Sequence, residues 1–186
     1  GDALAYVGFS DLAGSVERML QTLSTASPDL EAQLDALSAQ LPMLLGGTSL
    51  DDLRALAKGE HALVVTTGGA YPTGSLLLEV EDAARAGKTL DAIRNAVPLL
   101  ASQLQGGRQL PDWKRVTSAG ATGWQLPLSD KAGVVYGVGD GLAVIGTQPA
   151  SLGLLRSPVA NLGQDADYAA ATSGMPDAVT SVLWVD

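Results

Sequence analysis

The sequence predicts an α+β fold: a largely antiparallel β-sheet with amphipathic helices packed on it, and a helix-rich N-terminal third. Apolar residues recur at helical spacing in the region before residue 58,. Several short strand-like runs, joined by links of hairpin length, follow after it,. Links this short join antiparallel neighbours. The chain lacks the strict alternation of strand and helix that a doubly wound parallel sheet requires.

The N-terminal part predicts one strand and three helices. Ala3–Phe9 is the strand, and apolar residues then recur at helical spacing up to Leu23,. Ser27-Pro28 begins a second helix, which we expect Pro42 and Gly46-Gly47 to end,. Its apolar stripe consists of Leu30, Leu34, Leu37 and Leu41. Ser49 caps a third helix, with Asp51 and Asp52 near its positive end,.

The rest of the chain is expected to supply the sheet and one long helix. The helix is Ala83–Gln105, and Pro98 should kink or split it because proline removes a helical hydrogen bond,. Short helices are expected at 149–155 and 165–173, and Gly139–Gly141 is typical of a tight turn,. The predicted strands are His61–Thr67, Ser75–Val80, Lys114–Ser118, Gly123–Leu128, Gly133–Val138, Leu142–Thr147 and Ala178–Val185.

The length of the chain predicts a single α+β domain over residues 1–186, within which the helices of residues 12–58 could form a sub-lobe,. The two ends of the chain resemble each other when residues 1–11 are aligned without gaps on residues 176–186. The identical pairs are Asp2 and Asp177, Ala3 and Ala178, Val7 and Val182, and Asp11 and Asp186. Together with a start without Met, this echo predicts a unit excised from a longer anchored or repeated chain. A pseudo-symmetric closing strand is the alternative.

Composition excludes several classes of function. The formal net charge is −9, and Lys114-Arg115 is the only adjacent basic pair, so binding to nucleic acid is not expected,. There are no cysteines, which excludes disulfides and thiolate chemistry,. No apolar run is long enough to span a bilayer, so membrane attachment would need a segment outside this chain.

Each motif that resembles a catalytic or cofactor site fails at a named position. His61 is the only histidine and has no partner set for a metal or a triad,. Gly87-Lys88-Thr89 resembles the end of a phosphate-binding loop, but Asp82 stands where that loop needs glycine,. The glycines of 137–141 lead into a strand and not into a helix,. We therefore expect no enzyme, no cofactor and no metal.

Carboxylates cluster at Asp51/Asp52, at Glu79/Glu81/Asp82 and at Asp165/Asp167. Helix-end electrostatics explains each group, because negative charge is favoured at a helix start. A weak calcium site at Asp165/Asp167 and a carboxylate-dependent hydrolase are the alternatives.

Two further features could form a binding surface. The aromatic residues are expected to fill the core, although several exposed together would indicate a carbohydrate or peptide surface. Those concerned are Tyr71, Trp113, Trp124, Tyr136 and Trp184. An apolar cavity between the N-terminal helices and the sheet is the second feature, with simple packing as the alternative. Its expected lining is Leu12, Val16, Leu30, Leu34, Leu37 and Leu53.

Four segments resemble a family of bacterial cell-envelope proteins that is described as a domain of unknown function in high-GC Gram-positive bacteria and their relatives. The segments are Asp2–Val7, Gly59–Val65, Leu77–Asp82 and Gly141–Pro149. Members often carry an N-terminal anchor or signal. A short sequence motif like the opening of this chain recurs in them, and Met175–Ala178 is similar to that motif. The resemblance implies an extracytoplasmic, secreted or membrane-anchored protein and carries no active site.

We therefore expect a non-enzymatic, extracytoplasmic interaction or assembly domain of the bacterial cell envelope, with a protein as its partner. The alternative is a carrier for an apolar small molecule or lipid, held between the N-terminal helices and the sheet. The oligomeric state stays open.

Overall fold

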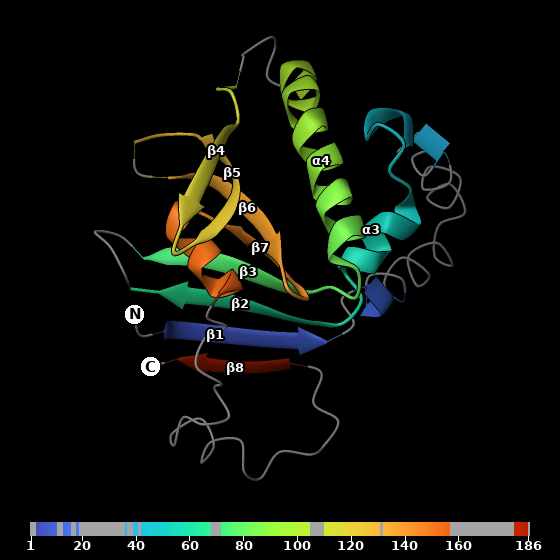
Figure 1. The fold of residues 1–186 in the computed structure, drawn as a ribbon. Coiled ribbons are helices and arrows are strands. Elements are labelled where there is room, and N and C mark those ends of the chain that lie inside the picture. The colour runs from blue at the N-terminus through green and yellow to red at the C-terminus, as the bar shows by residue number, and fades with distance from the viewer. Residues whose placement is uncertain are drawn as a thin grey trace.

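The computed structural model describes residues 3–10, 13–15, 18, 36, 39–40, 42–67, 72–104, 110–130, 132–156 and 181–185 (Figure 1). Its strands are β1 (Ala3–Ser10), β2 (Glu60–Thr66), β3 (Thr73–Glu79), β4 (Lys114–Ser118), β5 (Ala121–Pro127), β6 (Gly133–Gly139), β7 (Leu142–Gly146) and β8 (Ser181–Val185). The helices that accompany them are α3 (Leu50–Leu56), α4 (Ala83–Leu104) and the 3-10 helix η1 (Pro149–Leu155).

The strands form one sheet in the order β4-β5-β6-β7-β3-β2-β1-β8. Every pair of neighbours in this order is antiparallel, so the predicted α+β fold with an antiparallel sheet is confirmed. Strands β4 and β8 are the two edges. Helix α4 connects β3, in the middle of the sheet, to β4 at the far edge.

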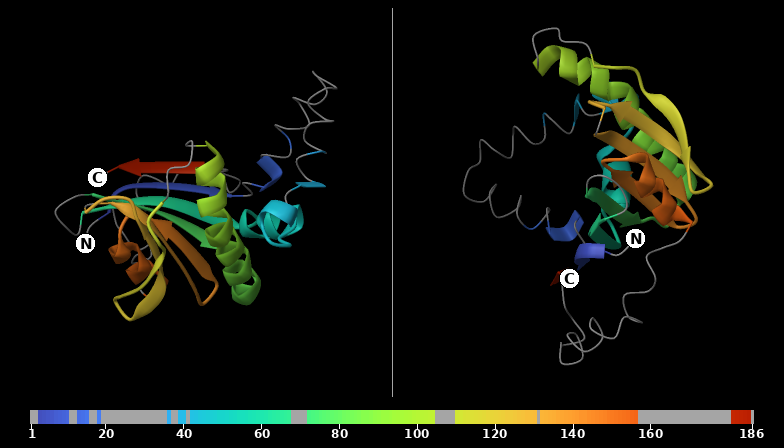
Figure 2. Two further views of the ribbon diagram at one scale, coloured as in Figure 1. Left: turned by 90° about the horizontal axis from the view of Figure 1, so that it is seen from above. Right: turned by 90° about the vertical axis from the view of Figure 1, so that its left-hand side faces the viewer.

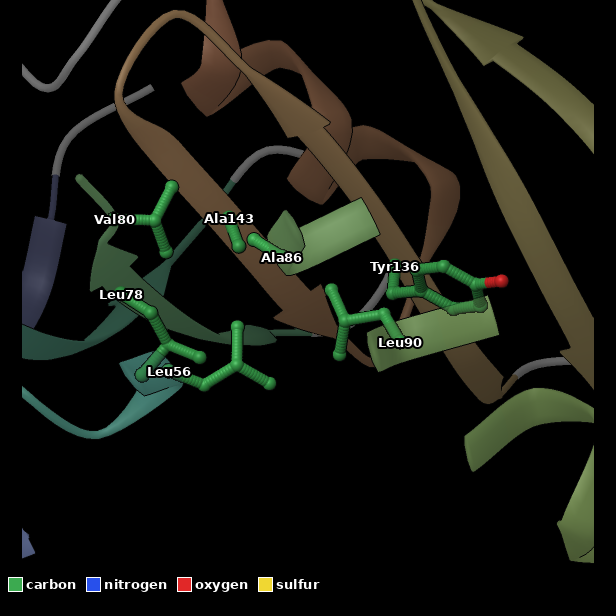
Figure 3. Close-up of a cluster of buried hydrophobic side chains, with 7 residues drawn as sticks. All are labelled: Leu56, Leu78, Val80, Ala86, Leu90, Tyr136 and Ala143. Carbon is green, nitrogen blue, oxygen red and sulfur yellow. The ribbon is translucent and has the colours of Figure 1, made fainter. Parts of the chain in front are cut away.

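Helices α3 and α4 cover one face of the sheet. Leu56 of α3 and Leu90 of α4 pack against Leu78 of β3 and Ala143 of β7 in a buried cluster (Figure 3). Tyr136 of β6 belongs to the same cluster, and Figure 3 shows its hydroxyl pointing away from the aliphatic side chains. We call this side of the sheet the α4 face.

On the opposite face of the sheet, η1 packs against β6 and β7, so these strands lie between η1 and α4 (Figure 2). Leu152 of η1 is fully buried in one cluster with Val135 and Val144. Gly123 and Gly137 make this packing possible, because a Cβ on either would lie 2.7 Å from Cδ2 of Leu152. The absence of a side chain at these two positions therefore lets η1 approach the backbone closely.

Most predicted elements agree with the structure to within a few residues, and two details differ. Helix α4 continues through Pro98 as one element, so of the kink or split expected there the split is wrong, and the kink stays a prediction. Of the residues expected to end the helix before α3, Pro42 does not do so, since residues 42–44 are helical, whereas Gly46 and Gly47 lie in the turn that follows at 45–47, as expected. Both glycines have positive φ, which suits the end of a helix,. Pro42 has the φ that a helix requires, so helical residues can follow it. The helices predicted around residues 12–23, 29–41 and 165–173 lie largely or wholly outside the described residues.

The strand β8 closes the sheet beside β1. Val7 pairs with Leu183, and Gly8 pairs with Val182. The echo of the two chain ends aligns Val7 with Val182 and Gly8 with Leu183 in the same chain direction, whereas the two strands pair antiparallel. The pseudo-symmetric closing strand therefore stays a prediction. The idea that β8 opens a second related unit stays a prediction.

Candidate functional site

The structure locates one of the six residues expected to line an apolar cavity. Leu53 lies half-buried on α3. The other five, Leu12, Val16, Leu30, Leu34 and Leu37, lie outside the described residues. The cavity between the N-terminal helices and the sheet therefore stays a prediction.

The carboxylates near α3 and α4 have structural partners. Asp52 and Ser49 form a capping box at the start of α3, and Asp52 also contacts Arg85 of α4 at 2.7 Å. Hydrogen bonds from the Ser49 hydroxyl and backbone, and then from Arg85, lower the pKa of Asp52 to about 2. Asp82 accepts a hydrogen bond from the backbone of Arg85 at the start of α4. Helix-end electrostatics thus accounts for Asp52 and Asp82, as expected.

Asp52, Asp82 and Arg85 line a cleft of about 260 Å³ between α3 and α4. Most of its charges are paired, Asp51 with Arg54, Asp52 with Arg85, and Glu81 with Lys58, while Asp82 accepts the backbone hydrogen bond at the start of α4. Within the described part of the chain, no group of three or more metal-binding side chains comes together. Asp165 and Asp167, the alternative calcium site, lie outside that part.

The two glycine-containing motifs have the structures expected of them. Gly87-Lys88-Thr89 lies inside α4, where the Thr89 hydroxyl donates to the carbonyl of Arg85, so no phosphate-binding loop is formed. Residues 137–141 belong to the β6–β7 hairpin, in which Gly139 pairs with Leu142. His61 is buried on β2 beside Phe9, and neither of its ring nitrogens has a hydrogen-bond partner among the residues that the structure describes.

Three of the five aromatic residues gather under α4. Trp113 contacts Tyr136 edge-on with ring centroids 5.7 Å apart, and Trp124 pairs with Tyr136 across β5 and β6. Tyr136 is buried, as expected of an aromatic residue that fills the core. Trp113 and Trp124 are only half-buried. Tyr71 lies outside the described residues, as does the side chain of Trp184.

Polar side chains of α4 complete this aromatic group. The Tyr136 hydroxyl donates a 2.6 Å hydrogen bond to Oδ1 of Asp91, and Nη1 of Arg94 lies 3.1 Å from the same oxygen. Nη1 makes no hydrogen bond, so this second contact is an ion pair without hydrogen-bond geometry. The Arg94 guanidinium also lies 4.1 Å from the centre of the Trp124 ring, a cation–π contact,. Burial, and then the hydrogen bond to Asp91, raise the pKa of Tyr136.

A cleft of about 330 Å³ opens between α4 and the strands β4–β6; we call it the α4 cleft. Its floor is a row of cross-strand neighbours, Arg115, Trp124 and Tyr136. Gly87 and Asp91 of α4 form the opposite wall. A Cβ placed on Gly87 would meet nothing within 4 Å, so this part of the wall is open.

Arg115 differs from the other charged residues of the α4 cleft. Asp91, the other charged residue of the lining, is paired with Arg94, whereas the Arg115 side chain is exposed and has no ion pair or hydrogen bond with any described residue. Sequence reasoning noted Arg115 only as half of a basic pair, and it missed Asp91 and Arg94. Their spacing of three residues on a helix was an available signal.

No family model, no curated protein and no solved structure matches this chain. The resemblance to a cell-envelope family therefore stays a prediction. Within the described residues, no helix combines the length and apolar character needed to cross a membrane.

Proposed function

We propose that this chain is a non-enzymatic binding domain that mediates interaction or assembly in the bacterial cell envelope, and that it binds through the α4 cleft. The observation that carries the proposal is Arg115, an exposed and unpaired guanidinium beside the half-buried ring of Trp124. Arginine and tryptophan are the residues that most often dominate binding energy at protein interfaces.

The size of the α4 cleft favours a small part of a larger partner. Its volume of about 330 Å³ is near the lower end for ligand sites, which span roughly 300–1,000 Å³,. One or two side chains of a protein partner would fill that volume. This supports an interaction domain more than a site for a large substrate.

A cleft-filling variant tests the proposal. Gly87→Gln places a side chain into the α4 cleft, since space is free around Gly87. Ala84→Gln is the matched control on an exposed position of the same helix, outside the cleft lining. The tagged full chain would be purified from envelopes of its own host after crosslinking, and its partners identified by mass spectrometry.

We expect a partner that co-purifies with the wild type and with Ala84→Gln but is lost with Gly87→Gln. A partner retained equally by all three proteins would overturn the cleft as the binding site. Placement outside the cytoplasm rests on the resemblance alone. It is tested by adding protease to intact cells, which should degrade the protein if the proposed localisation is right.

A carrier for an apolar molecule or lipid is the second candidate, and His61 favours it. A buried polar group without a partner costs free energy, and a ligand that supplied a hydrogen bond to it would recover some of that cost,. Native mass spectrometry of protein from its own host distinguishes the two. A retained lipid-sized mass that His61→Leu removes would favour the carrier over the interaction domain.

A further inference from the structure

We infer that the open edge of β4 binds an extended acidic segment of a partner protein, which adds to the sheet as one more strand. The inference rests on the proposed function and names the partner chemistry for the same region. It follows from the backbone geometry of β4, from the face on which its side chains lie, and from its charge.

The geometry of the β4–β5 hairpin shows which backbone groups are free. Its two turn residues, Ala119 and Gly120, have φ of 50° and 77°, as a two-residue type I′ turn requires,. Such a turn is closed by a hydrogen-bonded pair, here Ser118 and Ala121,. Because hydrogen-bonded and non-hydrogen-bonded pairs alternate along an antiparallel ladder, Thr117 faces Thr122 in a non-hydrogen-bonded pair,.

The same alternation makes Arg115 and Trp124 a non-hydrogen-bonded pair,. The Thr117 and Thr122 hydroxyls, 3.2 Å apart, agree with this assignment, since side chains approach closely at such pairs,. The N–H and C=O groups of Arg115 and Thr117 therefore point away from β5. Strand β4 is the last in the sheet, so these groups point to an open edge.

The side chains of the same two residues lie on the α4 face. Arg115 lines the α4 cleft, and Thr117 follows two residues later on the same side of the strand,. In a strand that bonds to the backbone of Arg115, the residue directly opposite Arg115 has its side chain on the α4 face as well. An acidic side chain at this position would meet the unpaired guanidinium next to Trp124.

Charge determines which kind of strand fits this edge. Lys114 and Arg115 are the only adjacent basic pair in a chain of net charge −9, and both are exposed. Neither has an ion pair with a described residue. Basic residues on an edge strand repel a second copy of the same strand, which is how proteins limit self-association at edges. An acidic strand whose carboxylates lie on the α4 face instead gains an ion pair with Arg115, in addition to the backbone hydrogen bonds.

A designed peptide tests the inference. The probe is a blocked nine-residue peptide of alternating valine and glutamate, compared with the same peptide carrying lysine in place of glutamate. A third peptide keeps the glutamates but has methylated backbone nitrogens at every second residue, which removes its donors to the edge. We expect the acidic peptide to bind the full chain, the lysine peptide not to bind, and methylation to weaken binding at least tenfold.

Two variants connect binding to β4. The double variant Lys114→Glu/Arg115→Glu should reverse the preference from the acidic to the lysine peptide. Thr117→Pro removes the N–H that faces the open edge and leaves the ladder to β5 intact, so it should abolish binding. Thr122→Val is its matched control, because it removes the same hydroxyl contact without changing the edge. Circular dichroism and thermal melting confirm that each variant is folded.

Amide chemical shifts in NMR spectra locate the peptide, and the largest changes are expected at Arg115 and Thr117. Equal binding of acidic and lysine peptides, or full binding by Thr117→Pro, would overturn the inference. So would a complete absence of binding by the acidic peptide. In each case the proposed function is judged separately, by the Gly87→Gln experiment.

Discussion

The hydroxyl of Tyr136 on β6 donates a 2.6 Å hydrogen bond to Oδ1 of Asp91 on α4, and the two residues are 45 positions apart in the chain. This bond joins the long helix to the sheet at the wall of the α4 cleft. It also satisfies the polar atom of a largely buried ring, which would otherwise lose its hydrogen bond to water,.

Replacing Tyr136 with phenylalanine should lower the free energy of unfolding by about 1–2 kcal/mol. A hydrogen bond to a charged group contributes about 1.5–3 kcal/mol, and the partial exposure of Asp91 reduces that value,. Urea unfolding measures the change. Asp91→Asn keeps an acceptor for the hydroxyl but also removes the ion pair with Arg94, so Tyr136→Phe is the variant that isolates this bond, and an unchanged unfolding free energy would contradict its role.

The contribution of Tyr136 to the free energy of unfolding should decrease in alkaline solution. Its pKa is raised by burial and then by Asp91, so the folded state holds the phenol proton more tightly than the unfolded state does. The stabilisation is complete below the ordinary tyrosine pKa of about 10 and is lost as the pH rises above it. The difference in unfolding free energy between wild type and Tyr136→Phe should therefore shrink by about 1 kcal/mol between pH 9 and pH 11. If the difference in unfolding free energy stayed constant over that range, the raised pKa of Tyr136 would be refuted.

Asp52 should stabilise the protein at neutral pH and lose this effect in acid. Hydrogen bonds from Ser49 and Arg85 lower its pKa to about 2, so the stabilisation is present above the ordinary value near 4 and is lost as the pH falls towards 2,. Asp52→Asn should unfold at lower urea than wild type at pH 6, and the two midpoints should converge near pH 2. Ser49→Ala removes the cap itself and should cost about 1 kcal/mol at pH 6,.

Replacing two glycines with alanine should change the free energy of unfolding in opposite directions. Gly87→Ala should raise the unfolding free energy by roughly 0.5–1 kcal/mol, because alanine favours a helix and nothing lies within 4 Å of the new Cβ,. Gly123→Ala should lower it by about 1–3 kcal/mol, because the new Cβ would meet the carbonyl of Tyr136 and lie 2.7 Å from Leu152,. Thermal or urea unfolding of the pair measures both, and equal effects would contradict the packing of η1.

An apolar residue at position 61 should be tolerated. Both nitrogens of His61 are buried without a partner, so His61→Leu removes an unsatisfied polar group of similar size,. We expect an unfolding free energy unchanged or higher by up to about 1 kcal/mol. A loss of more than about 2 kcal/mol would mean that the imidazole makes an interaction that this structure does not show. Phe9→Ala, which removes the neighbouring ring, should be clearly destabilising,.

The elements of the fold could be predicted because their signals are local. Ser49 and Asp52 define the start of α3 through side chains three residues apart, and the glycines of 137–141 define a hairpin. The edge position of β4 could not be predicted in this way. The β4–β5 hairpin is a local feature, but the order β4-β5-β6-β7-β3 depends on where α4 returns the chain to the sheet.

The α4 cleft could be predicted only in part. Trp113, Trp124 and Tyr136 stood out as scarce aromatic residues, but nothing in the sequence separated them from Tyr71 and Trp184. The pairing of Asp91 with Arg94 follows from their spacing of three residues on α4, but the place of Arg115 in the same cleft, without an ion pair to a described residue, depends on how α4 and β4 lie in the fold. No local pattern carries that information.

The sequence by itself determined the fold class, the ends of most helices and strands, the acidic surface and the absence of thiol chemistry. These follow from composition, from periodicity and from interactions between residues a few positions apart. Only the tertiary structure decided that Arg115, Trp124 and Tyr136 form one row beneath Asp91 and Gly87, next to an open strand edge. Periodicity shows which face of an element is buried, whereas strand order and register determine which buried faces meet, and both are set by contacts between residues distant in the chain.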